Sequence, residues 1–194
     1  MNRERHNEIL RILKCDGIGV ISTDTIYGIT ASAWSKKAVE KTYKITKRDP
    51  GKPFIILISS TKDLSLFGVK LDNTTRKILK KFWPGKVSVI LPVRSPKFHY
   101  LHRGTKTIAF RVPKKPSLIK LLKYAGPLIS TSANPQGKKP AETMAGARKY
   151  FSDEVDFYLN EGKIKSLPST LVEIKNGKIR VIRKGAGKIP KHTT

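Results

Sequence analysis

Short apolar segments that suit β-strands alternate along this chain with amphipathic segments that suit α-helices. Asn176-Gly177 between the last two apolar segments is the strongest β-hairpin signal in the sequence. The strands that we predict span about 19–22, 53–59, 87–93, 107–112, 155–160, 170–175 and 178–183, and a further strand ends at the hydroxyl-rich residues 130–132. The predicted helices span about 4–15, 36–46, 72–82, 116–125 and 142–151. This alternation predicts an α/β fold with a mixed sheet in one domain.

The length and composition exclude several classes of protein. A chain of 194 residues fits a single domain, and no apolar run approaches the roughly 18 residues that a membrane span needs. The first segment lacks the apolar core of a signal peptide, so we expect an amphipathic helix of a cytoplasmic protein. The single cysteine, Cys15, cannot form an intramolecular disulfide and is expected to be a buried thiol. The four histidines show no metal-ligand spacing, and no metal site is predicted.

A large positive charge is the dominant compositional signal. Lys and Arg number 40 against 14 Asp and Glu, which gives a net charge of +26. Such a chain attracts polyanions, whether nucleic acid, nucleotide or an acidic partner. The lysines are spread along the chain without one dominant cluster, so much of the excess can be ordinary solvated surface.

The segment Gly126–Thr143, GPLISTSANPQGKKPAET, carries the densest set of ligand-binding residue types. Its hydroxyl groups can bond ligand oxygens, its small residues allow close approach to the backbone, and its lysines add positive charge. A phosphorylated or carboxylated small molecule would fit, and a structural turn rich in turn-forming residues would look the same.

Arg111 is the single residue that points most clearly to a ligand. It follows three small or apolar residues in a predicted strand, and a buried arginine generally needs an anionic partner. Because Asp and Glu are scarce, we expect that partner to be a ligand. Thr25 can be a turn residue, and Arg48 and Lys52 can be surface charges, when each is taken alone. The glycine-rich phosphate loops and the GxSxG serine motif are absent.

Together, the segments at the predicted strand ends match a known family. The order TDTxYG, a basic KR…KP loop, WPG, TxAxRxP, STSAN, PST and R-x-G resembles the YrdC-like family of threonylcarbamoyl-AMP synthases. The resemblance covers about Gly17 to Gly187. It implies a single YrdC-like domain over 1–187, the short form of the family, with a loose tail over 188–194. The fold implied is a twisted mixed sheet flanked by helices, with a concave basic face.

The resemblance also implies roles for particular residues. Four would contact L-threonine: Thr25, Arg111, Ser130 and Ser169. Six would contact ATP: Arg48, Lys52, Thr107, Ser132, Asn134 and Arg183. No catalytic nucleophile is implied, because the enzyme works by positioning and electrostatics.

One departure from the family pattern affects the phosphate-binding loop. The family loop usually reads Lys-x-Arg-Pro, whereas this chain has Thr46 in place of the lysine and Asp49 in place of the proline. Lys47 or Lys44 could supply the missing charge. The departure also leaves open a relative that adenylates a different carbamate.

The implied activity joins L-threonine, bicarbonate and ATP, with Mg²⁺ on the triphosphate, into threonylcarbamoyl-adenylate and pyrophosphate. A threonylcarbamoyl transferase complex would then modify tRNA. Direct contact with tRNA or other RNA stays open, and no membrane partner is expected. The alternative is a non-catalytic RNA-binding protein that aids tRNA or rRNA maturation, which the charge favours and the low aromatic content, 8%, does not.

Overall fold

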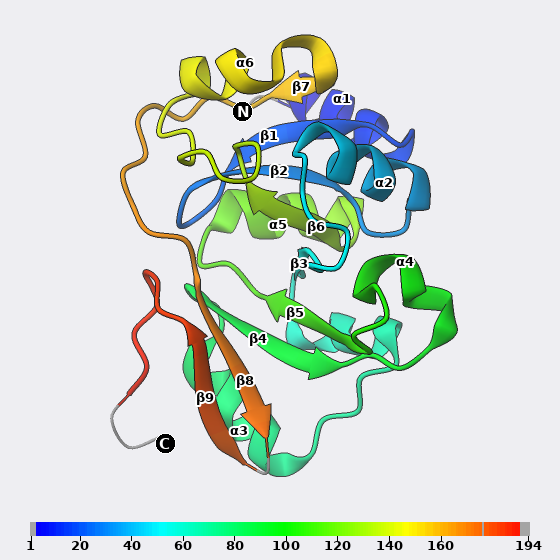
Figure 1. Cartoon of the computed structure of the whole chain (residues 1–194), viewed down its shortest axis with the longest axis vertical. Coiled ribbons are helices and arrows are strands. Elements are labelled where there is room, and N and C mark those ends of the chain that lie inside the picture. The colour runs from blue at the N-terminus through cyan, green and yellow to red at the C-terminus, as the bar shows by residue number, and fades with distance from the viewer. Residues whose placement is uncertain (1–2, 176, 191–194) are drawn as a thin grey trace.

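The computed structural model describes residues 3–175 and 177–190 of the chain. Nine strands form one mixed sheet in the order β7-β1-β2-β6-β3-β5-β4-β8-β9 (Figure 1). The strands are β1 (Ile18–Ser22), β2 (Tyr27–Ser32), β3 (Ile55–Leu57), β4 (Val87–Pro92), β5 (Thr107–Arg111), β6 (Leu128–Ser132), β7 (Phe157–Tyr158), β8 (Thr170–Lys175) and β9 (Lys178–Arg183). The predicted α/β fold class is therefore confirmed.

Six α-helices and three short 3₁₀ helices are present in the described part of the chain. The α-helices are α1 (Arg3–Lys14), α2 (Lys36–Ile45), α3 (Asn73–Phe82), α4 (His99–His102), α5 (Pro116–Ala125) and α6 (Met144–Phe151). The 3₁₀ helices are η1 (Thr61–Phe67), η2 (Pro96–Phe98) and η3 (Ser152–Glu154). No helix of the described residues is both long and apolar enough to cross a bilayer.

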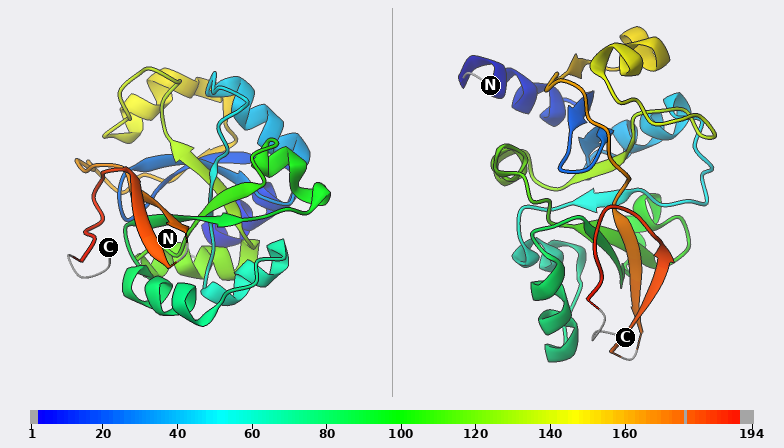
Figure 2. Two further views of the ribbon diagram at one scale, coloured as in Figure 1. Left: turned by 60° about the horizontal axis from the view of Figure 1, so that its bottom comes forward. Right: turned by 90° about the vertical axis from the view of Figure 1, so that its left-hand side faces the viewer.

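Helices cover both sides of the sheet (Figure 2). On one side, α1 and α5 pack Leu13 and Leu121 into a cluster that also contains Ile21 of β1. On the other side, α2 and α6 pack Val39 and Ala147 into the larger cluster. Because both sides are covered, β1 and β2 are buried along their whole length and show no alternation of buried and exposed residues.

Local signals in the sequence set several helix ends. Ser35 accepts a hydrogen bond from the amide of Ala38 at the start of α2, and Asp72 does the same for Thr75 at the start of α3. Helix α5 ends at Gly126, whose φ of 80° suits glycine better than any other residue. The predicted boundaries of these three helices hold to within a residue or two.

Three sequence predictions need correction. Cys15 is exposed, because α1 turns its apolar side to the core at Ile9 and Leu13 and ends just before the cysteine. Strand β2 was not predicted; its small and polar residues pair with β1 and β6. The strand predicted at 155–160 is reduced to the two residues of β7.

The chain after β9 is held against the sheet as far as Gly187. The amide of Ala186 donates to the carbonyl of Pro168, and the Thr170 hydroxyl donates to the carbonyl of Gly187 at 2.6 Å. Ile189 packs against the core although it is only partly buried. The predicted boundary between the domain at 1–187 and a loose tail at 188–194 stays a prediction. Asn176 and residues 191–194 of the predicted hairpin turn and tail lie outside the described residues, while the antiparallel pairing of β8 with β9 is confirmed.

Candidate active site

A cavity of about 150 Å³ lies over the centre of the sheet. Registers across four neighbouring strands bring its floor together: Ser130 of β6 pairs with Thr30 of β2 and with Ile55 of β3, and Ile55 pairs with Ala109 of β5. We call this hollow the substrate cavity. Its polar lining comes from six separate segments: Thr23, Thr25, Arg48, Arg111, Ser130, Thr131, Ser132, Ser169 and Arg183.

Small residues keep the floor of the substrate cavity open. A Cβ added to Gly28 would lie 3.0 Å from both the hydroxyl of Ser130 and the carbonyl oxygen of Thr131. Any side chain at this position would therefore displace the strand edge that carries the hydroxyl groups. The glycine that follows Tyr27 is needed for close packing of β2 against β6.

Arg111 lies at the end of β5, and only 4% of the residue is exposed. Its Nη1 atom lies 3.0 Å from the Asp24 carboxylate and donates to the Thr25 hydroxyl at 3.3 Å. Burial lowers the pKa of Arg111, the charge of Asp24 raises it, and the charge of Arg183 lowers it further. The expectation that a ligand would be the anionic partner of Arg111 is thus wrong for the protein alone, since Asp24 fills that role.

Arg111 nevertheless keeps a hydrogen-bonding position unused. Its Nε atom is buried and has no hydrogen-bond partner among the described residues. The second Asp24 oxygen accepts the backbone N–H of Lys114 at 3.0 Å, so the carboxylate is fixed between two segments of the chain. Asp24 therefore orients the guanidinium without using all of its donors.

Thr25 is positioned by a compact turn that connects β1 to β2. The Thr23 hydroxyl lies 2.9 Å from the Thr25 hydroxyl and donates to the carbonyl of Ile26 at 2.8 Å. The backbone amides of Thr25 and Ile26 in turn donate to the Thr23 hydroxyl. This closed set of bonds holds the Thr25 side chain, only 2% exposed as a residue, against the guanidinium of Arg111.

Arg48 is held by neutral oxygens on the opposite wall. Its Nε donates to the carbonyl of Lys52 at 2.9 Å and its Nη2 to the carbonyl of Pro53 at 3.1 Å. The guanidinium lies 5.3 Å from the centre of the Phe54 ring. Burial lowers the pKa of Arg48, and the charge of Arg183 lowers it further. Neutral carbonyls orient Arg48 but do not cancel its charge.

Arg183 and Ser169 close the third side of the substrate cavity. The Arg183 Nη2 donates to the carbonyl of Ser169 at 2.9 Å, and burial lowers the pKa of Arg183. The hydroxyls of Ser169 and Ser88 are 2.9 Å apart. Because the charge of Arg183 acts on both Arg48 and Arg111, the three guanidinium groups form one positive cluster.

Seven of the ten residues predicted as ligand contacts line this one cavity: Thr25, Arg48, Arg111, Ser130, Ser132, Ser169 and Arg183. The remaining three do not. Lys52 faces Asp49 at 3.4 Å, and Thr107 lies at the opposite end of β5 from Arg111. The Asn134 side chain donates to the carbonyls of Pro135 and Lys138, so it braces the loop after β6.

The structure gives a reason for the threonine at position 46. Thr46 is buried, and its hydroxyl donates to the carbonyl of Thr42 at 2.6 Å, which closes the end of α2. Lys44 and Lys47 both lie outside the lining of the substrate cavity. The missing family lysine is therefore replaced by a helix-ending residue, and neither neighbouring lysine takes its place there.

Sequence reasoning missed Asp24 as the partner of Arg111, and it left Thr23 and Thr131 out of the residues predicted to contact the substrates. Their signal was present, since Asp24 and Thr23 belong to the TDT motif and Thr131 to STSAN. The Asp24 oxygens face a guanidinium and a backbone amide.

The family model described as "Telomere recombination" (Sua5/YciO/YrdC) matches residues 11–185. This chain belongs to that family. A relative from Methanocaldococcus jannaschii, named a putative threonylcarbamoyl-AMP synthase, is 33% identical over 196 aligned residues that cover 98% of this chain and 92% of the relative. The predicted family is confirmed.

Solved structures support the same fold. Escherichia coli YciO superposes with a TM-score of 0.86 at 25% identity, over 96% of this chain and 92% of that one. Sua5 from P. abyssi, crystallised with L-threonine, superposes with a TM-score of 0.88 at 22% identity. That match covers 95% of this chain but only 55% of Sua5, so this chain spans a little over half the length of that protein.

Proposed function

We propose that this protein is a threonylcarbamoyl-AMP synthase, which makes threonylcarbamoyl-adenylate from L-threonine, bicarbonate and ATP and releases pyrophosphate. The adenylate would serve the threonylcarbamoyl-adenosine modification of tRNA. The observation that carries the proposal is the convergence of three arginines and six hydroxyl side chains on one cavity, where Asp24 holds one of the arginines, Arg111, in place. Similarity to relatives named threonylcarbamoyl-AMP synthase supports it.

In the proposed complex, Arg111 holds the threonine carboxylate. Its free Nε donor and the adjacent Thr25 hydroxyl suit a carboxylate that arrives beside the existing pair with Asp24. Ser130 and Ser169 would bond the rest of the amino acid from the floor and the far wall. The small volume of about 150 Å³ favours an amino acid with a short side chain.

ATP is larger than the substrate cavity and would extend out of it. Arg48 and Arg183 would hold its phosphates from two sides, with Ser132 at the end of β6. Lys52, Thr107 and Asn134 would contact ATP only where it extends beyond the cavity, and their side-chain contacts in the protein alone are with other groups.

The chemistry proposed needs no nucleophile from the protein. The threonine nitrogen attacks the carbon of bicarbonate, water leaves, and a carbamate forms. A carbamate oxygen then attacks the α-phosphorus, the bond to the bridging oxygen breaks, and pyrophosphate leaves with the electron pair. All three reagents bring anionic groups to the site, so fixed guanidinium groups lower the free energy of bringing them together.

Magnesium belongs to the proposal as a companion of the triphosphate. The described residues contain no group of three or more acidic, histidine or cysteine side chains that could hold a metal. The cavity donors are guanidinium and hydroxyl groups, which fit phosphate oxygens rather than a cation. Mg²⁺ would therefore be held by phosphate oxygens and water, and would neutralise phosphate charge.

The tRNA-modifying transferase complex, direct tRNA contact and the cytoplasmic location stay predictions. The non-catalytic RNA-binding alternative is less well supported, because Arg111 and Ser169 are almost fully buried. Phosphates of an RNA backbone bind exposed cations, whereas a buried arginine needs a ligand that enters the cavity.

The decisive experiment supplies ATP, Mg²⁺ and bicarbonate with each amino acid in turn and follows pyrophosphate. Release that depends on threonine and on bicarbonate is the expected result. Release with another amino acid would identify a relative of altered specificity. No release, together with RNA binding that weakens steeply with salt and ignores threonine, would favour the alternative.

A further inference from the structure

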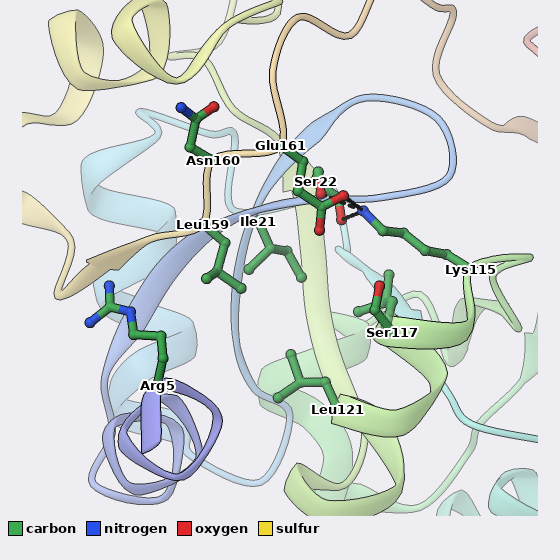
Figure 3. A pocket seen from close by; sticks show the side chains of 10 residues that line it. Arg5, Ile21, Ser22, Lys115, Ser117, Leu121, Leu159, Asn160 and Glu161 are labelled. Carbon is green, nitrogen blue, oxygen red and sulfur yellow. Dashed lines mark hydrogen bonds and ion pairs between the residues drawn. The ribbon is translucent and has the colours of Figure 1, made fainter. Parts of the chain in front are cut away.

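Two larger hollows lie outside the substrate cavity, and they differ in how their cations are partnered. One, of about 510 Å³, lies between α1, β1 and α5, and we call it the Lys115 hollow (Figure 3). In it, Lys115 donates to the Glu161 carboxylate at 2.5 Å and to the Ser22 carbonyl at 3.1 Å. Arg5 pairs with Glu8 at 2.6 Å. The cations of this hollow are neutralised within the protein, so it gives no reason to expect an anion.

The other hollow, of about 470 Å³, has lysines that lack such partners. Four separate segments of the chain contribute to it: Lys81 at the end of α3, Lys86 before β4, Lys114 after β5 and Lys188 after β9. None of these four forms an ion pair with a carboxylate among the described residues, in contrast to Lys115. We call this hollow the lysine groove.

Lysine is more frequent among the residues that line the groove than in the chain as a whole. Five of the eleven residues that line the groove are lysines, counting Lys115, whereas Lys and Arg together make up 40 of the 194 residues in the chain. A helix C-terminus attracts cations, which accounts for Lys81 at the end of α3. That effect does not account for Lys86, Lys114 or Lys188, which lie in other segments.

The carboxylate that lines the groove does not offset these charges. Asp24 is already 3.0 Å from the Arg111 guanidinium and accepts the Lys114 backbone N–H. Its charge is therefore compensated on the side of the substrate cavity. Four lysines without a carboxylate partner among the described residues consequently line one hollow, and such an arrangement attracts anions.

The groove and the substrate cavity share two walls. Asp24 lines the groove, and the residues on either side of it, Thr23 and Thr25, line the substrate cavity. On the second wall, the carbonyl of Gly187, a groove residue, accepts a hydrogen bond from the hydroxyl of Thr170, which follows the cavity residue Ser169. An anion in the groove would lie next to the proposed substrates.

We propose that the lysine groove is a second anion site, which binds the phosphate groups of a polyanion beside the substrate cavity. Lysine side chains suit this ligand because they are flexible point charges that can follow several phosphates. The phosphates can come from a free oligophosphate or from the backbone of a nucleic acid. The inference does not depend on the proposed function, since it rests on the groove alone.

The test compares two triple variants with the same change in net charge. Lys86→Glu/Lys114→Glu/Lys188→Glu alters the groove, and Lys37→Glu/Lys70→Glu/Lys149→Glu alters exposed lysines of α2, the loop after η1 and α6. Binding of tripolyphosphate and of a single-stranded oligouridylate is measured by calorimetry over a range of salt concentrations. The same titrations are repeated in an Arg48→Ala/Arg183→Ala background, in which binding in the substrate cavity is removed. Thermal unfolding checks that each variant folds.

The groove variant is expected to bind at least one probe about tenfold or more weakly than the control variant, and the magnitude of its salt slope should fall by about three. Loss of tripolyphosphate binding identifies a free oligophosphate as the source of the bound phosphates. Loss of oligouridylate binding alone identifies a nucleic-acid backbone as the source. Equal losses in the two triple variants would overturn the proposal, because bulk charge would then explain the binding. Unchanged binding in the groove variant would overturn it as well.

Discussion

The substrate cavity and the Lys115 hollow both contain buried or half-buried cations, yet these cations have different hydrogen-bond partners. In the substrate cavity, Arg48 and Arg183 are oriented by neutral backbone carbonyls. In the Lys115 hollow, the ammonium of Lys115 meets the carboxylate of Glu161 (Figure 3). A neutral acceptor orients a cation and leaves its charge available to a ligand, whereas a carboxylate neutralises that charge. The partner of a cation, rather than its burial, therefore marks an anion site.

Arg111 stands between these two cases, because it has a carboxylate partner and a free Nε. Its replacement should give the largest effect. Arg111→Lys keeps a charge next to Asp24 but loses the planar fork, so we expect threonine-dependent activity to fall by about 30- to 1,000-fold, equivalent to about 2–4 kcal/mol of transition-state stabilisation. Steady-state kinetics at several threonine concentrations provide the measurement.

Arg111→Ala alone is a poorer experiment. It leaves Asp24 as an uncompensated buried charge, which typically costs about 3–5 kcal/mol of stability. The double variant Asp24→Asn/Arg111→Ala removes both charges and should unfold at a higher temperature than Arg111→Ala while staying inactive. If Arg111→Lys keeps near-normal activity, the role assigned to Arg111 is wrong.

The next effect concerns the arginines held by neutral carbonyls. Arg48→Ala and Arg183→Ala should each raise the KM for ATP by about ten- to a hundredfold, because each removes one charge-assisted contact to phosphate. Threonine affinity should change much less. Separate KM values for ATP and threonine measure this, and a control substitution at the exposed Arg94 should change neither constant.

The smallest effect belongs to the Lys115 hollow. Burial raises the pKa of Glu161, but its bonds to Lys115 and Ser22 outweigh burial and hold the pKa below its usual value. A carboxylate with a lowered pKa contributes stability above its unfolded-state pKa, and this contribution is lost as the pH falls through the folded-state value. Glu161→Gln should therefore lower Tm slightly at neutral pH and make no difference in strong acid.

Thermal unfolding across pH measures that difference. Exposed ion pairs contribute about 0–1 kcal/mol, so a shift of only a few degrees is expected. Catalytic constants should stay close to those of the unaltered protein. A large loss of activity in Glu161→Gln would break the contrast between the two hollows, because it would make the neutralised cation part of the active site.

The sequence predicted the helices well and the strands unevenly, for a physical reason. Caps at Ser35 and Asp72 are local signals that need no tertiary contact. Strand β2 has no apolar alternation, because all of its residues are buried and several of them are small or polar; β1 pairs with one edge of the strand and β6 with the other. Its pairing partners define it as a strand, and one of them, β6, is far from it in the chain.

The candidate site shows the same division. Motif order was enough to predict most of the lining of the substrate cavity. It could not predict that Asp24 would reach Arg111, because the two are brought together only by the sheet and the turn at residues 23–26. It also could not predict that Thr46 ends α2 through a bond to Thr42. Contacts made by folding, rather than residue types, decide which charges stay available.

The most direct test of the whole account is a single incubation with ATP, Mg²⁺, L-threonine and isotope-labelled bicarbonate, analysed by mass spectrometry. The account predicts an adenylate that contains both threonine and the labelled carbon, with one pyrophosphate released for each adenylate formed. An adenylate of threonine without the label, or pyrophosphate release that does not need bicarbonate, would contradict it.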